Sequence, residues 1–219
     1  MTHPIPTAKI QAILFDLDGT LIDSDDVAVR QLAQRFSFLS PARATRLART
    51  IIMKVETPGN AAITLLDLLH LDQPIFRLKE RWQTQAAHFH LIPGVSQMLG
   101  ALDGRYRLGL VTTRSRRDVD DFLAQYPAIS ARVAISCSAE DTRRLKPHPQ
   151  PVRSAAAGLG LSPAQCLMVG DTTVDVRAAR RAGAWSVGVL CGFGEQRELR
   201  RAGAHAILPS TGELGRLWG

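Results

Sequence analysis

The 219-residue chain contains only three cysteines, and no two of them form a CxxC pair. An odd number of thiols without metal-binding spacing argues against a disulfide framework and against a zinc site. We therefore expect Cys137, Cys166 and Cys191 to be reduced and the chain to be cytoplasmic. The N-terminal MTHPIPTAKIQ also lacks the basic start and the apolar stretch of a secretory signal.

Long hydrophobic runs are missing as well, since no apolar stretch approaches the ~20 residues that a membrane span needs. We therefore expect no association with a membrane. Aromatic residues make up only 5% of the chain, and its 27 Lys and Arg residues are scattered without interleaved aromatics. The net charge of +7 would suit an acidic partner, but this scattered pattern argues against nucleic-acid binding.

Apolar residues make up 45% of the chain, which is enough for one large domain, or for one domain with an insert. From residue 92 onward, short apolar runs alternate with helical segments of about a dozen residues. The runs are 108–112, 133–136, 166–170, 186–190 and 205–208, and the run at 10–15 belongs with them. Strands joined by crossover helices are typical of a parallel sheet, so the sequence predicts a Rossmann-like, doubly wound α/β core.

Between the first strand and residue 92, apolar residues recur at helical spacing in four stretches, the last of which includes Phe89. Four helices with short connections can pack as a small bundle. We therefore predict an α-helical cap domain at 21–92. It is inserted into an α/β core formed by residues 1–20 and 93–219.

Carboxylates directly follow two of the predicted strands. Asp16 and Asp18 lie in ILFDLDGTLIDS, and Asp171 and Asp175 lie in GDTTVD. Ligands of doubly wound sheets bind at the carboxyl ends of the strands, so these side chains are expected to converge there. Clustered carboxylates need a cation among them, and all-oxygen ligands beside a phosphate favour Mg²⁺. Helix capping would explain Asp171 or Asp175 alone, but not the whole set.

Two further segments supply groups that suit a phosphate. Lys146 lies in LKPHP, where prolines stiffen the loop that presents its ammonium group, and Thr112 ends a predicted strand. With Mg²⁺, these groups would let an anionic carboxylate approach an anionic phosphorus. Asp16 would attack the phosphorus to form an aspartyl-phosphate. Asp18 would protonate the leaving oxygen and later deprotonate the attacking water.

The segments DLDGT, Thr112, KPHP and GDTTVD occur in this order in the haloacid dehalogenase-like hydrolase superfamily, which the chain resembles over almost its full length. LIPGVSQML and GVLCGFGEQRELRRAGAHAIL resemble its phosphoglycolate phosphatase branch in particular. The resemblance implies a Mg²⁺-dependent phosphatase of a small phosphorylated metabolite, with phosphoglycolate as the first candidate. We expect the protein to be either a monomer or a homodimer.

The resemblance also implies roles for the acidic residues. Asp16 would be both nucleophile and metal ligand, and Asp171 would be a metal ligand. Asp18 would be the general acid and base, with its backbone carbonyl on the metal. Asp175 would support the metal through water, or it would orient Lys146.

The phosphoryl group would be held by Thr112, Lys146 and the backbone amide of Thr113. Asn or Ser is more frequent than Thr at the position of Thr113 in this family, which leaves its side-chain contacts open. An aspartate at the position of Asp18 separates phosphatases from dehalogenases, which have Tyr there, and from phosphonate-cleaving relatives, which have Ala.

The cap would close over the site and contribute substrate contacts. Its substrate loop is expected at 53–60, where Lys54 would pair with a second anionic group and Thr57 and Asn60 would bond hydroxyls. An equally open interpretation is that Lys54 is simply solvated.

Three other functions share parts of this pattern. A sugar-phosphate mutase resembling β-phosphoglucomutase would use the same site but would exclude water differently. An inorganic pyrophosphatase would cleave a phosphoanhydride there. A catalytically silent binding protein would keep the fold alone, although it would not need Asp16, Asp18, Lys146 and Asp171 together.

Overall fold

The computed structural model describes residues 5–23, 36 and 88–218. Most of the predicted cap lies outside these residues, and with it lie Lys54, Thr57 and Asn60 of the predicted substrate loop. The domain boundaries therefore stay a prediction.

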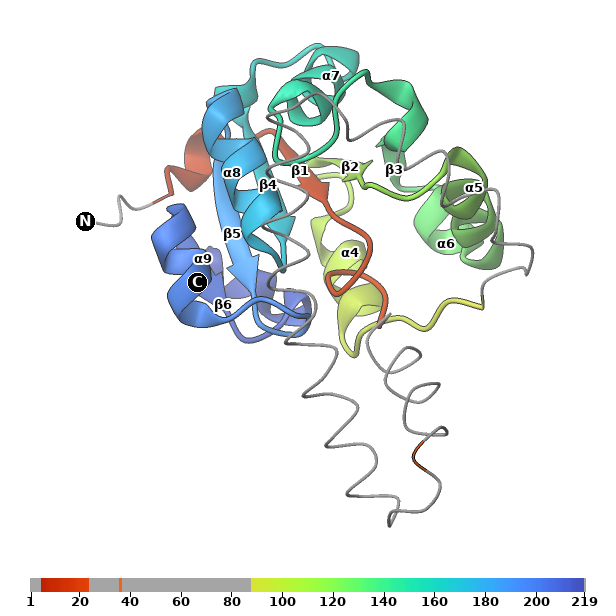
Figure 1. Cartoon of the computed structure of the whole chain (residues 1–219). Coiled ribbons are helices and arrows are strands. Elements are labelled where there is room, and N and C mark those ends of the chain that lie inside the picture. The colour runs from red at the N-terminus through yellow and green to blue at the C-terminus, as the bar shows by residue number, and fades with distance from the viewer. Residues whose placement is uncertain (1–4, 24–35, 37–87, 219) are drawn as a thin grey trace.

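A parallel sheet of six strands in the order β3-β2-β1-β4-β5-β6 forms the centre of the described part (Figure 1). The strands are β1 Ala12–Phe15, β2 Arg107–Val111, β3 Val133–Cys137, β4 Cys166–Gly170, β5 Trp185–Val189 and β6 Ala206–Leu208. The sequence predicted each of them to within two residues. The Rossmann-like α/β fold is therefore confirmed.

Helices cover both faces of this sheet. They are α4 Val95–Leu102, α5 Arg116–Gln125, α6 Pro127–Ser130, α7 Gln150–Gly158, α8 Thr173–Ala182 and α9 Gln196–Ala202. Short 3-10 helices are η1 Thr7–Lys9, η2 Ala139–Asp141, η3 Pro163–Gln165 and η4 Thr211–Leu217. Helices α4 and α5 and η4 pack on one face, and α7 and α8 pack on the other.

The central strand β1 shows why these strands read as continuous apolar runs. Ile13 and Phe15 face the core formed with α4 and α5, whereas Ala12 and Leu14 face the core formed with α7 and α8. Side chains alternate between the two faces of a strand, and here both faces are covered. All four residues are consequently buried.

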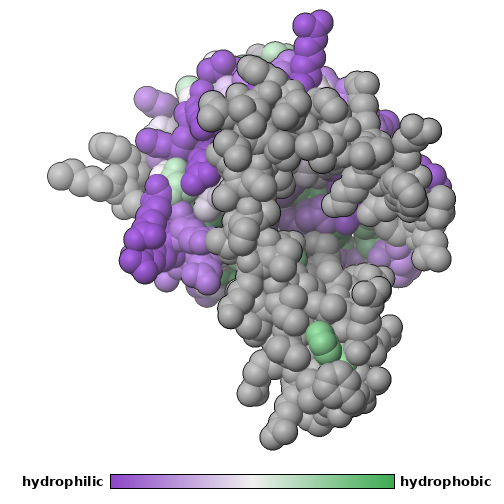
Figure 2. Space-filling view, viewed as in Figure 1, coloured by the Kyte–Doolittle hydropathy of each residue, from purple (hydrophilic) through white to green (hydrophobic). Residues whose placement is uncertain are grey.

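The outer helices are polar toward the solvent. Figure 2 shows hydrophilic side chains on the visible surface over α8 and α9, where Arg180, Arg200 and Arg201 are exposed. The opposite side of α8 is lined by small buried residues, including Ala178 and Ala179, that pack closely on the sheet. Among the described helices, none has the length and apolarity that a membrane crossing requires.

The two chain segments that flank residues 24–87 run side by side. Asp23 N donates to His90 O at 2.8 Å, and Ile22 and Leu91 form an antiparallel bridge. The prediction that Phe89 lies on a helix is wrong, because residues 88–90 are outside any helix. Instead, the main chain of Phe89 exchanges hydrogen bonds with the Gln125 side chain at 3.0 and 2.6 Å.

Candidate active site

The order of the strands in the sheet indicates where the candidate site lies. The chain runs from β1 outward to β2 and β3, and then crosses to β4, β5 and β6 on the other side of β1. Ligands of doubly wound sheets bind outside the carboxyl ends of the strands where the winding direction reverses, and this point lies between β1 and β4 here. Asp16 follows β1 directly, and Asp171 follows β4 directly.

A tight turn after β1 carries the first motif. Asp16 N still donates to Val169 O at 2.9 Å, and Leu21 N then folds back to Leu17 O at 2.9 Å. Gly19 lies in this turn at a φ of 63°, and a Cβ there would overlap the Asp171 carboxylate. Only glycine combines this dihedral with so close an approach. The sequence Asp-Gly thus lets the turn pass directly beside Asp171.

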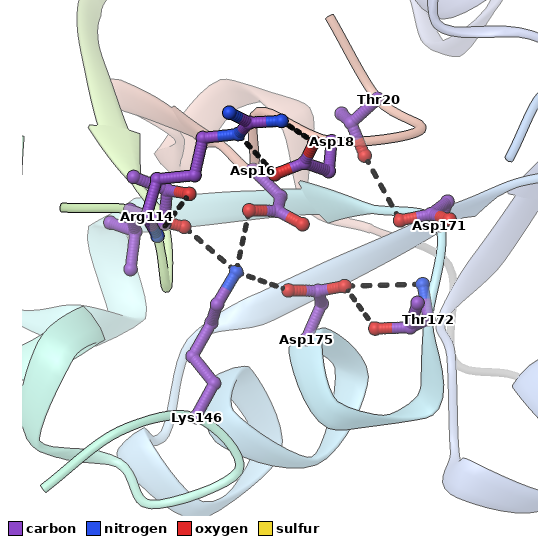
Figure 3. Close-up of polar contacts among 10 residues, drawn as sticks. Asp16, Asp18, Thr20, Arg114, Lys146, Asp171, Thr172 and Asp175 are labelled. Atoms are coloured by element: carbon purple, nitrogen blue, oxygen red, sulfur yellow. Dashed lines mark hydrogen bonds and ion pairs between the residues drawn. The ribbon is translucent and has the colours of Figure 1, made fainter. Parts of the chain in front are cut away.

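Lys146 links two of the acidic residues from below the sheet edge. Its Nζ lies 2.7 Å from Asp16 Oδ1 and 2.6 Å from Asp175 Oδ1, and it donates to Val111 O at 2.9 Å (Figure 3). The side chain is only 1% exposed. Burial disfavours its charged form, but the charges of Asp16 and Asp175 outweigh this and raise the pKa of Lys146. The ammonium is therefore a fixed positive charge.

Asp16 experiences opposing influences. Burial raises the pKa of its carboxyl from 3.8 to about 7, although the neighbouring charge of Lys146 lowers it; the charges of Asp175 and Asp18 raise it further. Without a further cation the carboxyl would therefore be partly protonated at neutral pH.

Asp175 is fully engaged by donors. Its Oδ1 accepts from Lys146, and its Oδ2 accepts from the Thr172 backbone N at 3.1 Å and from the Thr172 hydroxyl at 2.6 Å. Thr172 and Asp175 form a capping box at the start of α8. The sequence of this helix terminus thereby fixes the carboxylate that holds Lys146.

The possible metal ligands at this site suit a hard cation. Single carboxylate oxygens of Asp16, Asp171 and Asp175 lie within 4.8 Å of one another, and all three residues are buried. Asp171 is oriented by the Phe193 backbone N at 2.9 Å and by the Thr20 hydroxyl at 3.5 Å. Oxygen ligands without nitrogen or sulfur match Mg²⁺.

The predicted phosphate ligands adjoin this cluster. Thr112 follows β2 and is buried, and its hydroxyl oxygen accepts from Arg114 N at 3.1 Å. The hydroxyl hydrogen thus stays able to donate to a phosphoryl oxygen. Thr113, next in the chain, is partly exposed.

Sequence reasoning missed Arg114. Its Nε and Nη2 donate to Asp18 Oδ2 and Oδ1, each at 2.7 Å, and its Nη1 lies 3.5 Å from Asp118 Oδ2. Burial opposes the charge of the guanidinium, but the hydrogen bond and charge of Asp18 outweigh burial and raise the pKa of Arg114. The only signal in the sequence was its position two residues after Thr112, at the end of a strand.

Comparison with known proteins identifies the family to which the chain belongs. The family model described as haloacid dehalogenase-like hydrolase matches residues 13–189. The chain belongs to this family of hydrolases, as the sequence motifs predicted.

The relatives narrow the class to phosphatases. The chain is 33% identical to a phosphoglycolate phosphatase of Xanthomonas campestris, over 84% of each chain. It is 30% identical to the pyrophosphatase PpaX of Bacillus velezensis, over 83% of each chain. A solved hydrolase of the same superfamily from Geobacter sulfurreducens shares the fold at a TM-score of 0.62 and 22% identity, covering 96% of this chain and 97% of that one. The chain is thus an enzyme of the phosphatase class, not a silent binding protein.

Proposed function

We propose that the enzyme hydrolyses a small phosphorylated metabolite in a Mg²⁺-dependent reaction through an aspartyl-phosphate on Asp16. The observation that carries this proposal is the contact of buried Asp16 with Lys146, beside Asp171, at the carboxyl edge of the sheet. This arrangement supports a role of Asp16 as nucleophile, because its carboxyl lies next to a fixed positive charge. We propose further that the enzyme works in the cytoplasm as a monomer or a homodimer.

The metal would be held by the carboxylates of Asp16 and Asp171 and by the backbone carbonyl of Asp18. Bound there, Mg²⁺ would neutralise charge on these carboxylates and on the phosphoryl oxygens. Asp175 is a poor additional ligand because donors already occupy both of its oxygens. Its contacts favour the role of orienting Lys146 over that of supporting the metal.

The reaction would proceed in two displacements. An Asp16 oxygen forms a bond to phosphorus while the bond from phosphorus to the leaving oxygen breaks, and Asp18 gives that oxygen a proton. Both Asp18 oxygens accept hydrogen bonds from Arg114 in the structure, so Asp18 must take up this proton and give up one of those bonds before the step. Water then attacks the phosphorus, gives a proton to Asp18, and releases phosphate and free Asp16. Lys146, the Thr112 hydroxyl and the Thr113 amide would hold the phosphoryl oxygens in both steps.

Phosphoglycolate is the first candidate substrate, because the segments at 91–99 and 188–208 and the phosphoglycolate phosphatase relative both point to it. Pyrophosphate is the second candidate, supported by the pyrophosphatase relative. The predicted contacts from Lys54, Thr57 and Asn60 would select between such substrates. A mutase is the third candidate, and it would transfer the phosphoryl group to a sugar faster than to water.

Phosphate release from phosphoglycolate, pyrophosphate and para-nitrophenyl phosphate tests the proposal. We expect turnover with Mg²⁺, loss of turnover with EDTA, and at least a thousandfold drop in kcat for Asp16→Asn, on the order of what removal of a nucleophile costs. Asp121→Asn on α5 is a matched control, because Asp121 pairs only loosely with exposed Arg117 at 3.9 Å. A folded Asp16→Asn protein with the parent's activity would refute the assignment.

A further inference from the structure

The guanidinium of Arg114 occupies a defined place beside the proposed general acid. In Figure 3 the Asp18–Arg114 pair lies on one side of Asp16, and Lys146 lies on the other. A leaving oxygen within hydrogen-bond reach of Asp18 is therefore no more than about 6 Å from the guanidinium nitrogens that hold Asp18. The guanidinium thus borders the space where the leaving group must lie.

The two hydrogen bonds to Asp18 engage only some of the N–H groups of Arg114. A guanidinium has five N–H groups in a fixed plane, and the two bonds to Asp18 engage one on Nε and one on Nη2. The Nη1 pair with Asp118 is long, at 3.5 Å. Within the described residues, these contacts leave at least one N–H group on each of Nη1 and Nη2 for a ligand.

Contacts within the protein orient the guanidinium plane of Arg114 before any ligand binds. Its Cζ lies 5.4 Å from the centre of the Phe89 ring, a cation–π distance. Phe89 is itself held by Gln125 and by the Tyr126 hydroxyl, which donates to Phe89 O at 2.7 Å. The Arg114 side chain is nevertheless 24% exposed, so a ligand can reach it. A pre-oriented, accessible guanidinium binds a carboxylate or phosphate at low entropic cost.

We propose that Arg114 binds a negatively charged group on the leaving side of the substrate, so that the enzyme prefers phosphate compounds whose leaving group carries a carboxylate or a phosphate. The inference rests on the proposed function, because the role of Asp18 locates the leaving oxygen. Glycolate is the leaving group of phosphoglycolate, and inorganic phosphate is the leaving group of pyrophosphate. Both carry a negative charge within three bonds of the leaving oxygen. One residue of the core would thereby serve both candidate substrates.

The competing explanation is that Arg114 only positions Asp18. In that case, loss of the guanidinium would impair all substrates equally. The two explanations separate when a substrate with an anionic leaving group is compared with one of nearly the same shape whose leaving group is uncharged. Phosphoglycolate and 2-hydroxyethyl phosphate form such a pair, since the carboxylate of one is replaced by a hydroxymethyl group in the other.

The experiment measures kcat/KM for both esters with Mg²⁺ in the parent, Arg114→Gln and Arg114→Lys. We expect the ratio of phosphoglycolate to 2-hydroxyethyl phosphate to exceed one in the parent and to fall at least about tenfold in Arg114→Gln, with partial retention in Arg114→Lys. Arg117→Gln is the control for charge, because Arg117 is 71% exposed on α5, the helix that begins two residues after Arg114. Its ratio should equal that of the parent.

An unchanged ratio in Arg114→Gln, with both esters impaired alike, would overturn the proposal, and so would a parent ratio below one. If Arg114→Gln turns over neither ester, calorimetry in an Asp16→Asn background replaces kinetics. Removal of Arg114 must then weaken the binding of phosphoglycolate more than the binding of 2-hydroxyethyl phosphate. Failure of the proposed function looks different. The parent would then release no phosphate from any ester in a Mg²⁺-dependent manner.

Discussion

At the scale of single residues, the site depends on how charges are balanced around Asp16. Its carboxyl is buried between Lys146 and the other carboxylates, and burial raises its pKa to about 7. The charge of Lys146 alone does not offset the effect of burial, which disfavours the ionised carboxylate. A second cation would lower the pKa of Asp16 and so favour the ionised form that acts as nucleophile.

This balance predicts how Mg²⁺ stabilises the protein at different pH. A folded-state pKa above the unfolded value gives stability that is complete below pH 3.8 and is lost as the pH rises through about 7. Mg²⁺ competes with that proton, so the rise in Tm that it causes should be larger at pH 8 than at pH 6. Thermal unfolding of the parent and of Asp16→Asn checks this. An equal Mg²⁺ effect at both pH values would contradict it.

The glycines near Asp171 give a second prediction at this scale. A Cβ on Gly194 would overlap the backbone oxygen of Asp171, so Gly194→Ala must displace the backbone after β4. We expect a loss of about 1–3 kcal/mol in the free energy of unfolding, typical of overpacking, together with reduced activity. Urea denaturation measures the loss.

Gly100 provides the matched control for that substitution. It lies inside α4, and a Cβ there meets no atom within 4 Å. Gly100→Ala should therefore stabilise the protein by about 0.5–1 kcal/mol through helix propensity. Equal effects of the two substitutions would show that local crowding at Asp171 is not the cause.

At the scale of elements, the site is built on the ends of β1 and β4 and on the start of α8. The start of α8 is the clearest case, because Thr172 and Asp175 satisfy each other's polar groups there. The same Asp175 binds Lys146, so the cap of a helix also holds the ammonium in the site. Local sequence preference and site geometry coincide in this one turn.

Removal of the cap tests that connection. Thr172→Ala loses the hydroxyl that accepts from the Asp175 backbone and donates to its carboxylate, and it should cost about 1 kcal/mol of stability. It should also lower kcat, because Asp175 becomes less well ordered beneath Lys146. Thr172→Ser keeps the hydroxyl and should retain both properties. Denaturant unfolding and phosphatase kinetics on the two variants distinguish the hydroxyl from the methyl group.

At the scale of the whole molecule, the described core is held by two apolar layers that meet on β1. Segments on either side of residues 24–87 join this core as neighbours, with Asp23 N bonded to His90 O. The segment that ends at residue 23 and the segment that begins at residue 88 therefore contact each other directly. The insertion of a cap at 21–92 stays a prediction.

Replacement of residues 24–87 by a short Gly-Ser linker tests the predicted domain division. We expect the shortened chain to fold cooperatively, because the linker has to span only two adjacent segments. Circular dichroism and urea unfolding of purified protein measure this. Turnover of small esters should persist at a reduced level, since the residues proposed for catalysis lie in the core. A shortened chain that fails to fold would reject these boundaries.

The sequence by itself determined the strands and the motif positions. Runs such as 166–170 are apolar on both faces, and Asp16 and Asp171 follow their strands at once, so the parallel sheet and its rim were predictable from local pattern. Tertiary structure alone decided which groups touch. Asp18 and Arg114 are 96 residues apart in the chain, and Lys146 and Asp175 are 29 apart. Charged side chains carry no periodic signal for their partners, because packing of the sheet, not local preference, brings them together.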